Sequence, residues 1–152
     1  MSKIHLRAAA ALLLSAVISV SAWAAGASRT EAQGQVGAAV GHVKKVGVEQ
    51  AAKDFNAAPE WKVKGMNVIF NDMKGVVLAS SLNERLVGKQ TLEMKDPSGK
   101  AFVKEFTAAA QKGEGWIDYQ FINPETKQLE ERSMFVRRVA GFDGYIGVAI
   151  TK

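Results

Sequence analysis

Cysteine is absent from the 152-residue chain, and histidine occurs only twice. The lack of cysteine excludes disulfides, thiolate metal sites, a cysteine nucleophile and the lipid-modified cysteine of a lipoprotein. His42 is the only histidine beyond the first few residues, and the sequence has no Ser-His-Asp set, zinc spacing or phosphate-cradling glycine loop. We therefore expect no metal, no cofactor and no enzymatic activity, and a fold stabilised by its hydrophobic core alone.

A concentration of charge of one sign is also missing. The chain has 20 basic and 15 acidic residues, a net charge of +5, and its only basic doublets are Lys44-Lys45 and Arg137-Arg138. Because a nucleic-acid footprint is a concentrated basic face, we expect no nucleic-acid partner. The composition, 47% hydrophobic and 23% charged, is that of a globular protein.

Long hydrophobic runs are limited to the N-terminus. Lys3 and Arg7 are followed by an apolar stretch over residues 8–20, and Ala22-Trp23-Ala24 supplies the small residues that a signal peptidase accepts. This order predicts a signal peptide over residues 1–24 that is cleaved after Ala24.

Two alternatives apply to this N-terminal segment. Cleavage can instead follow Ala27, or the segment can stay as an uncleaved anchor, although about 13 apolar residues are few for a bilayer that needs about 20. A cleaved signal peptide predicts a soluble periplasmic protein in which residues 25–152 form one domain.

The first part of this domain has helical periodicity. Val36, Val40 and Val43 fall on one side of a helix over residues 28–46. Gly47 interrupts the pattern, and a second helical segment follows over residues 48–55. We expect this amphipathic start to lie across a sheet.

Apolar segments separated by turn residues predict that sheet. Strands over 66–70 and 76–79 form a hairpin around the turn Asn71–Gly75, and residues 80–95 form a crossing loop.

A second helix is expected after this loop. Asp96 as N-cap and Pro97 at the first helical position predict where it begins, and Gly113 closes it. Phe102 and Phe106 lie on its buried face.

Three more strands are expected over 116–122, 129–139 and 145–151. In the first of them Tyr119 and Phe121 share a face, and Trp116 points to the opposite one. Tight turns between neighbouring strands indicate an antiparallel sheet, so the predicted class is α+β.

Six sequence segments carry a resemblance to a known family. They are Asn71–Ala79 (NDMKGVVLA), Leu86–Lys89 (LVGK), Lys95–Phe102 (KDPSGKAF), Gly113–Tyr119 (GEGWIDY), Asn123–Lys127 (NPETK) and the strand through Phe135-Val136. In this order, over nearly the whole mature chain, they resemble the single Cache domain family (type 2), the PAS-like extracytoplasmic sensor modules of bacteria.

The resemblance implies a long N-terminal helix packed beside a mostly five-stranded antiparallel sheet with one further helix. It places a ligand pocket on the other side of the sheet, for a short organic anion such as acetate, propionate or pyruvate. The chain is similar to the free-standing exported form of the family. Implied partners are the ligand and a membrane receptor, kinase or transporter, and the implied state is a monomer or a helix-mediated homodimer.

The family pattern and the strand alternation together mark the residues expected to bind the ligand, which are Arg132, Tyr119, Asn67, Ser80, Phe121 and Phe135. Tyr119 is retained from the pattern, and strand alternation adds Phe121. The other four depart from it: Arg132 replaces a lysine, Phe135 a tyrosine, Ser80 a histidine and Asn67 an aromatic residue.

Each of these residues has an ordinary structural alternative. Arg132 matches a carboxylate bidentately and is always charged, but it could also be a solvated arginine beside Glu130 and Glu131. Tyr119 could donate its hydroxyl to a ligand or simply pack in the core. The alternatives for Ser80 and Asn67 are an exposed loop serine and a structurally bonded amide.

Two functions are therefore open. The first is a soluble periplasmic Cache domain that binds a short carboxylate for signal sensing. The alternative is a ligand-free protein-interaction module associated with a membrane sensor or transporter. A cavity lined by Arg132 and Tyr119 would favour the first, and a filled pocket interior the second.

Overall fold

The computed structural model describes residues 26–152, so the predicted signal peptide lies outside the described residues. The helices are α1 (Arg29–Val46), α2 (Val48–Ala57) and α3 (Phe102–Gln111), with short 3-10 helices at Pro59–Trp61 and Glu84–Leu86. The strands are β1 (Asn67–Asp72), β2 (Val77–Ser80), β3 (Glu114–Ile122), β4 (Leu129–Arg138) and β5 (Gly144–Thr151). The predicted α+β class is confirmed.

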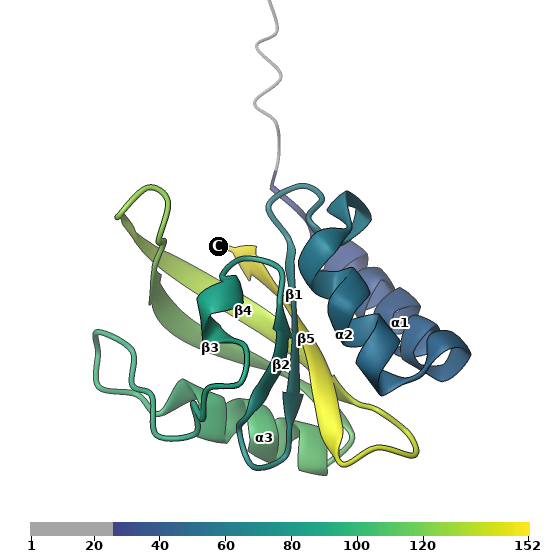
Figure 1. Ribbon diagram of the computed structural model, residues 1–152. Coiled ribbons are helices and arrows are strands. Elements are labelled where there is room, and N and C mark those ends of the chain that lie inside the picture. The colour runs from purple at the N-terminus through teal and green to yellow at the C-terminus, as the bar shows by residue number, and fades with distance from the viewer. Residues whose placement is uncertain (1–25) are drawn as a thin grey trace, which may run out of the picture.

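One five-stranded sheet organises the molecule, in the order β2-β1-β5-β4-β3 (Figure 1). Every neighbouring pair is antiparallel. The last three strands form a meander, and the β1–β2 hairpin extends it because β1 pairs with β5. The sheet therefore has two faces, each able to carry its own hydrophobic layer.

The N-terminal helices cover one face of the sheet (Figure 1). Ser28 and Glu31 form a reciprocal capping box that begins α1. Gly47, with a φ of 86°, ends α1 and precedes α2. The single long N-terminal helix implied by the resemblance is thus two helices, because the backbone conformation at Gly47 is incompatible with a continuous one.

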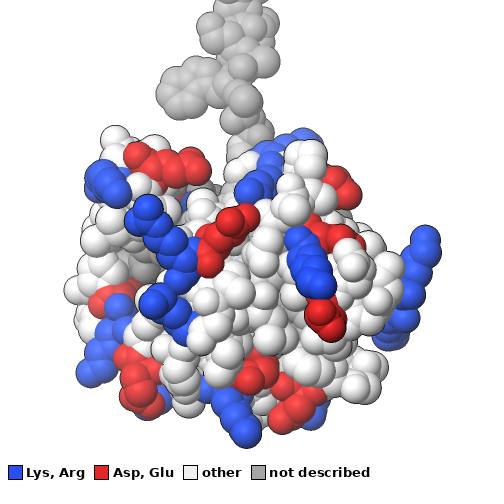
Figure 2. Space-filling view, in the orientation of Figure 1, with Lys and Arg blue, Asp and Glu red and all other residues white. Residues whose placement is uncertain are grey.

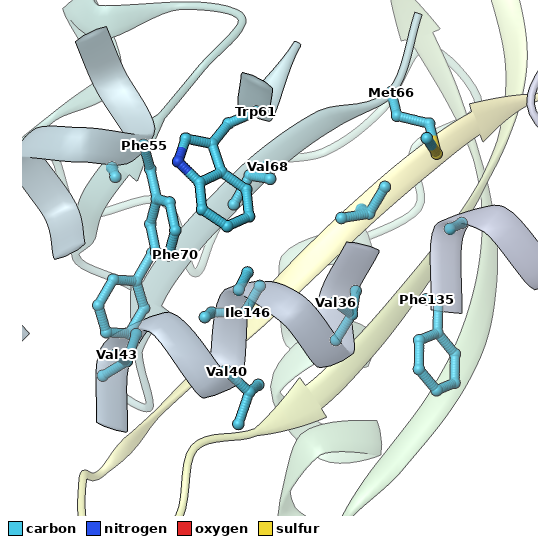
Figure 3. Packing of buried hydrophobic residues seen from close by; sticks show 14 of the residues in the cluster. Val36, Val40, Val43, Phe55, Trp61, Met66, Val68, Phe70, Phe135 and Ile146 are labelled. Atoms are coloured by element: carbon cyan, nitrogen blue, oxygen red, sulfur yellow. The ribbon is translucent and has the colours of Figure 1, made fainter. Parts of the chain in front are cut away.

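Aromatic rings fill the core between these helices and the sheet (Figure 3). The rings of Phe55 and Trp61 meet edge to face at 4.9 Å, and those of Phe55 and Phe70 at 6.0 Å. Phe55 and Phe70 are fully buried, and Phe135 is buried in the same cluster. Each such ring contributes about 2 kcal/mol through burial alone, so this layer is a major source of the stability of the domain.

The beginning of α3 differs from the prediction. The helix begins at Phe102 rather than at Pro97, and Asp96 is not its N-cap. Asp96 instead closes a turn, in which its side-chain Oδ1 accepts from the backbone N–H groups of Ser98 and Lys100. An aspartate followed by Pro-Ser-Gly satisfies such a turn as well as a helix start, because its side chain bonds the following backbone in either case.

The surface carries no concentrated charge on the face in Figure 2, where basic and acidic residues are interspersed. Between residues 26 and 152, no helix combines the length and apolarity needed to cross a membrane.

Candidate functional site

A cavity of about 190 Å³ lies on the face of the sheet opposite α1 and α2, between the sheet, α3 and the loop after β2. A cavity of about 150 Å³ is large enough for benzene. The site is therefore large enough for a small organic molecule.

Strand alternation supplies the floor of the cavity. Every second residue of β1 lines it, and so do Tyr119 and Phe121 from β3 and Arg132 and Met134 from β4. Helix α3 and the loop after β2 contribute apolar walls, which are Leu82, Leu86, Met94, Phe102, Val103 and Phe106. The lining is thus mainly apolar, with a few polar groups at defined places, as is usual for small-molecule sites.

The structure brings five of the six predicted residues together around this cavity, namely Arg132, Tyr119, Asn67, Ser80 and Phe121. Phe135 is the exception and corrects the prediction. It is buried in the core on the other face of the sheet, with its ring 5.2 Å from that of Trp116. Arg132 and Phe135 are three positions apart on one strand, so their side chains must leave it on opposite faces.

Arg132 is buried, with only 5% of its surface exposed. Its Nε donates to Glu130 Oε2 at 2.7 Å, and its guanidinium lies over the ring of Phe121, 4.6 Å from the centroid. Of the described residues that line the cavity, Arg132 alone is charged. This burial excludes the alternative of a solvated arginine. The neighbouring Glu130 named in that alternative does pair with Arg132.

Glu130 pairs with Arg132, and each of its carboxylate oxygens accepts a hydrogen bond. Its Oε1 accepts from Asn123 Nδ2 at 2.8 Å, and its Oε2 accepts from Arg132. Burial opposes ionisation of Glu130, but the hydrogen bonds from Asn123 and Arg132 outweigh it and lower the pKa of the carboxyl group. Glu130 is therefore ionised at neutral pH.

Tyr119 lies opposite Arg132 in the β3–β4 register. Its ring stacks on Phe102 at 5.1 Å and meets Phe106 edge to face at 5.2 Å. Burial raises the pKa of Tyr119 to about 12, against the opposing effect of the Arg132 charge. The hydroxyl thus keeps its proton and can donate it, so Tyr119 both packs in the core and borders the cavity.

The polar residues on β1 and β2 are already partly bonded. Asn67 Nδ2 donates to the carbonyl of Gly65 at 3.2 Å. Ser80 is buried, and its Oγ accepts from the backbone N–H of Asn83 at 3.2 Å. Ser80 is therefore not an exposed loop serine, and its hydroxyl proton stays available to a ligand.

Asn71 lines the cavity and was missed by sequence reasoning. Its Nδ2 donates to the hydroxyl of Tyr145 at 3.2 Å, while its buried Oδ1 has no partner within the part of the chain that the structure describes. Asn71 follows Asn67 by four positions on the same strand, so period two places both on one face. The sequence analysis assigned Asn71 to a turn rather than to the strand, so this spacing was not recognised.

The donor chemistry of the site suits an organic group better than a metal ion. No cluster of three or more His, Cys, Asp or Glu side chains occurs among residues 26–152. The site instead offers the guanidinium of Arg132, the hydroxyls of Tyr119 and Ser80, and the side-chain amides of Asn67 and Asn71. These groups form hydrogen bonds with an oxygen-bearing ligand.

The sequence assigns this fold to a known family. A family model described as single Cache domain 2 matches residues 24–151. The chain belongs to the single Cache domain 2 family, whose members are sensor domains and are typically not enzymes. No curated protein matches the chain in sequence.

Solved structures show the same fold at low sequence identity. A methyl-accepting chemotaxis protein from Vibrio parahaemolyticus RIMD 2210633 is similar with a TM-score of 0.70 and 18% identity, over 80% of this chain and 86% of that one. A periplasmic sensor domain of a chemotaxis protein gives 0.64 and 19%, over 80% and 88%. A Cache chemosensory domain, solved as the structural basis for carboxylic acid recognition, gives 0.64 and 20%, over 80% and 86%.

Proposed function

We propose that the domain binds a short carboxylate in the cavity between the sheet and α3, and that it does so in the periplasm as the sensing step of a signalling pathway. The observation that carries the proposal is the buried Arg132 at the edge of an otherwise uncharged cavity. A buried guanidinium is costly unless anions or acceptors satisfy it, and Glu130 bonds only its Nε.

The remaining Nη groups of Arg132 can present paired donors to a carboxylate. The Tyr119 hydroxyl, across the strand pair, can donate to the same oxygen atoms. The apolar residues of α3 and of the loop after β2 would enclose the hydrocarbon part of the ligand. A related Cache domain recognises carboxylic acids, and this supports the same ligand class here.

Substitution of Arg132 tests the proposal. We expect acetate, propionate or pyruvate at a hundred times its Kd to stabilise the wild-type protein by about 2.7 kcal/mol, a rise of several degrees in Tm. Arg132→Lys keeps one charge but loses the paired donors, so affinity should fall about ten-fold or more.

Arg137→Lys is the matched control, because Arg137 lies on the same strand but faces away from the cavity and pairs with Glu114. Its affinity should equal that of the wild-type protein. Unchanged binding in the folded Arg132→Lys protein would exclude Arg132 as the carboxylate site.

A ligand-free interaction module is the second candidate. Ile122 and Leu129 pair across the β3–β4 hairpin and are 55% and 57% exposed, a small apolar surface at one edge of the sheet. This function predicts no thermal shift with any carboxylate, and loss of partner capture when both residues are replaced by serine.

A further inference from the structure

The charge of Arg132 is already balanced inside the protein. Glu130 is two positions away on β4 and bonds Arg132 at 2.7 Å, with side chains only 6% and 18% exposed for the arginine and the glutamate. Asn123, in the β3–β4 turn, holds the other carboxylate oxygen. An ion pair whose carboxylate is also held by Asn123, and which is largely shielded from water, keeps its charges in place when a ligand enters.

The rest of the cavity supplies no charge. The lining residues of β1, β2, α3 and the loop between them are apolar or carry amides and hydroxyls. A ligand carboxylate on Arg132 therefore makes the local net charge −1, because Glu130 already contributes one negative charge. A second carboxylate on the same ligand would have no cation within the cavity to meet it.

We infer that Glu130 sets the charge of the ligand, so that the site accepts monocarboxylates and rejects dicarboxylates. This inference rests on the proposed function and specifies its ligand class. Glu130 acts through Arg132: it fixes the Nε edge of the guanidinium, leaves the Nη edge to the ligand and weakens the attraction for anions. Removal of its charge should therefore strengthen anion binding, whereas removal of Arg132 should weaken it.

The test uses protein expressed from the full chain and two probes of equal carbon number, propionate and malonate, in titration calorimetry. Glu130→Gln keeps the shape and an oxygen to accept from Arg132 Nε. Glu131→Gln makes the same charge change one residue along, where the side chain is exposed, faces away from the cavity and accepts from Gln120. A difference between the two variants therefore reports the loss of the charge beside Arg132 together with the loss of the acceptor for Asn123 Nδ2.

Wild-type protein should bind propionate at least ten-fold more tightly than malonate. Glu130→Gln should bind propionate about ten-fold more tightly than wild type, as expected for one charge a few ångströms away in a partly buried site, and should lose most of its discrimination against malonate. Glu131→Gln should match the wild type in both respects. Without ligand, Glu130→Gln should also have a lower Tm, because Arg132 is left without its counter-charge.

Three results would overturn the inference while leaving carboxylate binding intact. The wild-type protein could bind malonate as tightly as propionate. Glu130→Gln could bind propionate no more tightly than the wild type, or Glu130→Gln and Glu131→Gln could change propionate affinity equally. The first needs only the wild-type protein, so the inference stays testable if Glu130→Gln fails to fold. If folded wild type and folded Glu130→Gln both fail to bind either probe, the proposed function itself falls.

Discussion

Asp96 connects the loop over the cavity to the sheet through hydrogen bonds. Substitution of Asp96 should therefore lower the stability of the domain and its affinity for the ligand. Its Oδ1 accepts from the backbone N–H of Ser98 and of Lys100, each at 2.9 Å. Its Oδ2 accepts from the backbone N–H of Gln120 on β3 at 3.0 Å. Only 7% of Asp96 is exposed, so water cannot replace these bonds efficiently.

The magnitude follows from those bonds. Asp96→Asn keeps the Oδ1 acceptor but turns an amide N–H₂ group towards the N–H of Gln120, which leaves that donor unsatisfied in a site largely shielded from water. One lost charge-assisted bond and its unsatisfied partner cost about 2 kcal/mol. For a domain of this size this is a fall in Tm of roughly 5–8 °C.

The effect should also depend on pH in a defined direction. Burial opposes ionisation of Asp96, but the bonds from Gln120, Ser98 and Lys100 outweigh it and hold its pKa at about 2, below its ordinary value of 3.8. A depressed folded-state pKa stabilises the fold above about pH 4, and this contribution is lost as the pH falls towards 2. The wild-type advantage over Asp96→Asn should shrink across the same interval.

Urea unfolding followed by circular dichroism at pH 7 and at steps from pH 5 to 2.5 measures both effects. Asp143→Asn is the control, since Asp143 is an exposed turn residue paired with Arg138. Equal stability of Asp96→Asn and wild type at pH 7, or a difference that does not change with pH, would refute the reasoning. Propionate affinity of Asp96→Asn, measured at pH 7, should fall because Met94 and the rest of the loop lose their anchor.

Two further substitutions probe the cavity and its surroundings. Tyr119→Phe keeps the ring packing, so the free energy of unfolding should change by less than about 1 kcal/mol. The affinity for propionate, measured by calorimetry, should fall about five-fold. Equal affinity in the variant and the wild type would mean that the hydroxyl does not reach the ligand. Gly75→Ala should cost about 2 kcal/mol or more in urea unfolding, because the φ of Gly75 is 86° and an added Cβ would meet Leu92 Cβ at 2.8 Å. Gly88→Ala, at a φ of 78° with open space around it, separates backbone strain from this collision.

Much of the fold could be predicted because it depends on local periodicity. The valine spacing identified α1, and the alternation of β3 correctly placed Tyr119 and Phe121 on one face and Trp116 on the other. These patterns follow from the geometry of one element and need no knowledge of its neighbours. The resemblance to Cache domains added the mostly five-stranded antiparallel sheet and the side on which the pocket lies, whereas the strand order, with β1 beside β5, came only from the structure.

The candidate site was harder to predict from the sequence because its chemistry depends on contacts between secondary-structure elements. Asp96 could serve as a helix cap or close a turn, and its hydrogen bond from Gln120 on β3, which stabilises the turn, could not be read from the sequence. Family position suggested Phe135 for the pocket, but position in a pattern does not specify the face on which a side chain leaves a strand. The pairing of Glu130 with Arg132 was visible in the sequence, whereas its burial was not.

The two-faced arrangement of β4 has an evolutionary consequence. Arg132 and Met134 face the cavity, while Ser133 and Phe135 face the helices. Insertion or deletion of one residue within this strand would exchange the two sets, placing a guanidinium beneath α1 and a phenyl ring in the cavity. Homologous sequences should therefore vary in residue type along β4 yet keep its length, and should concentrate length changes in the exposed turn at residues 125–128.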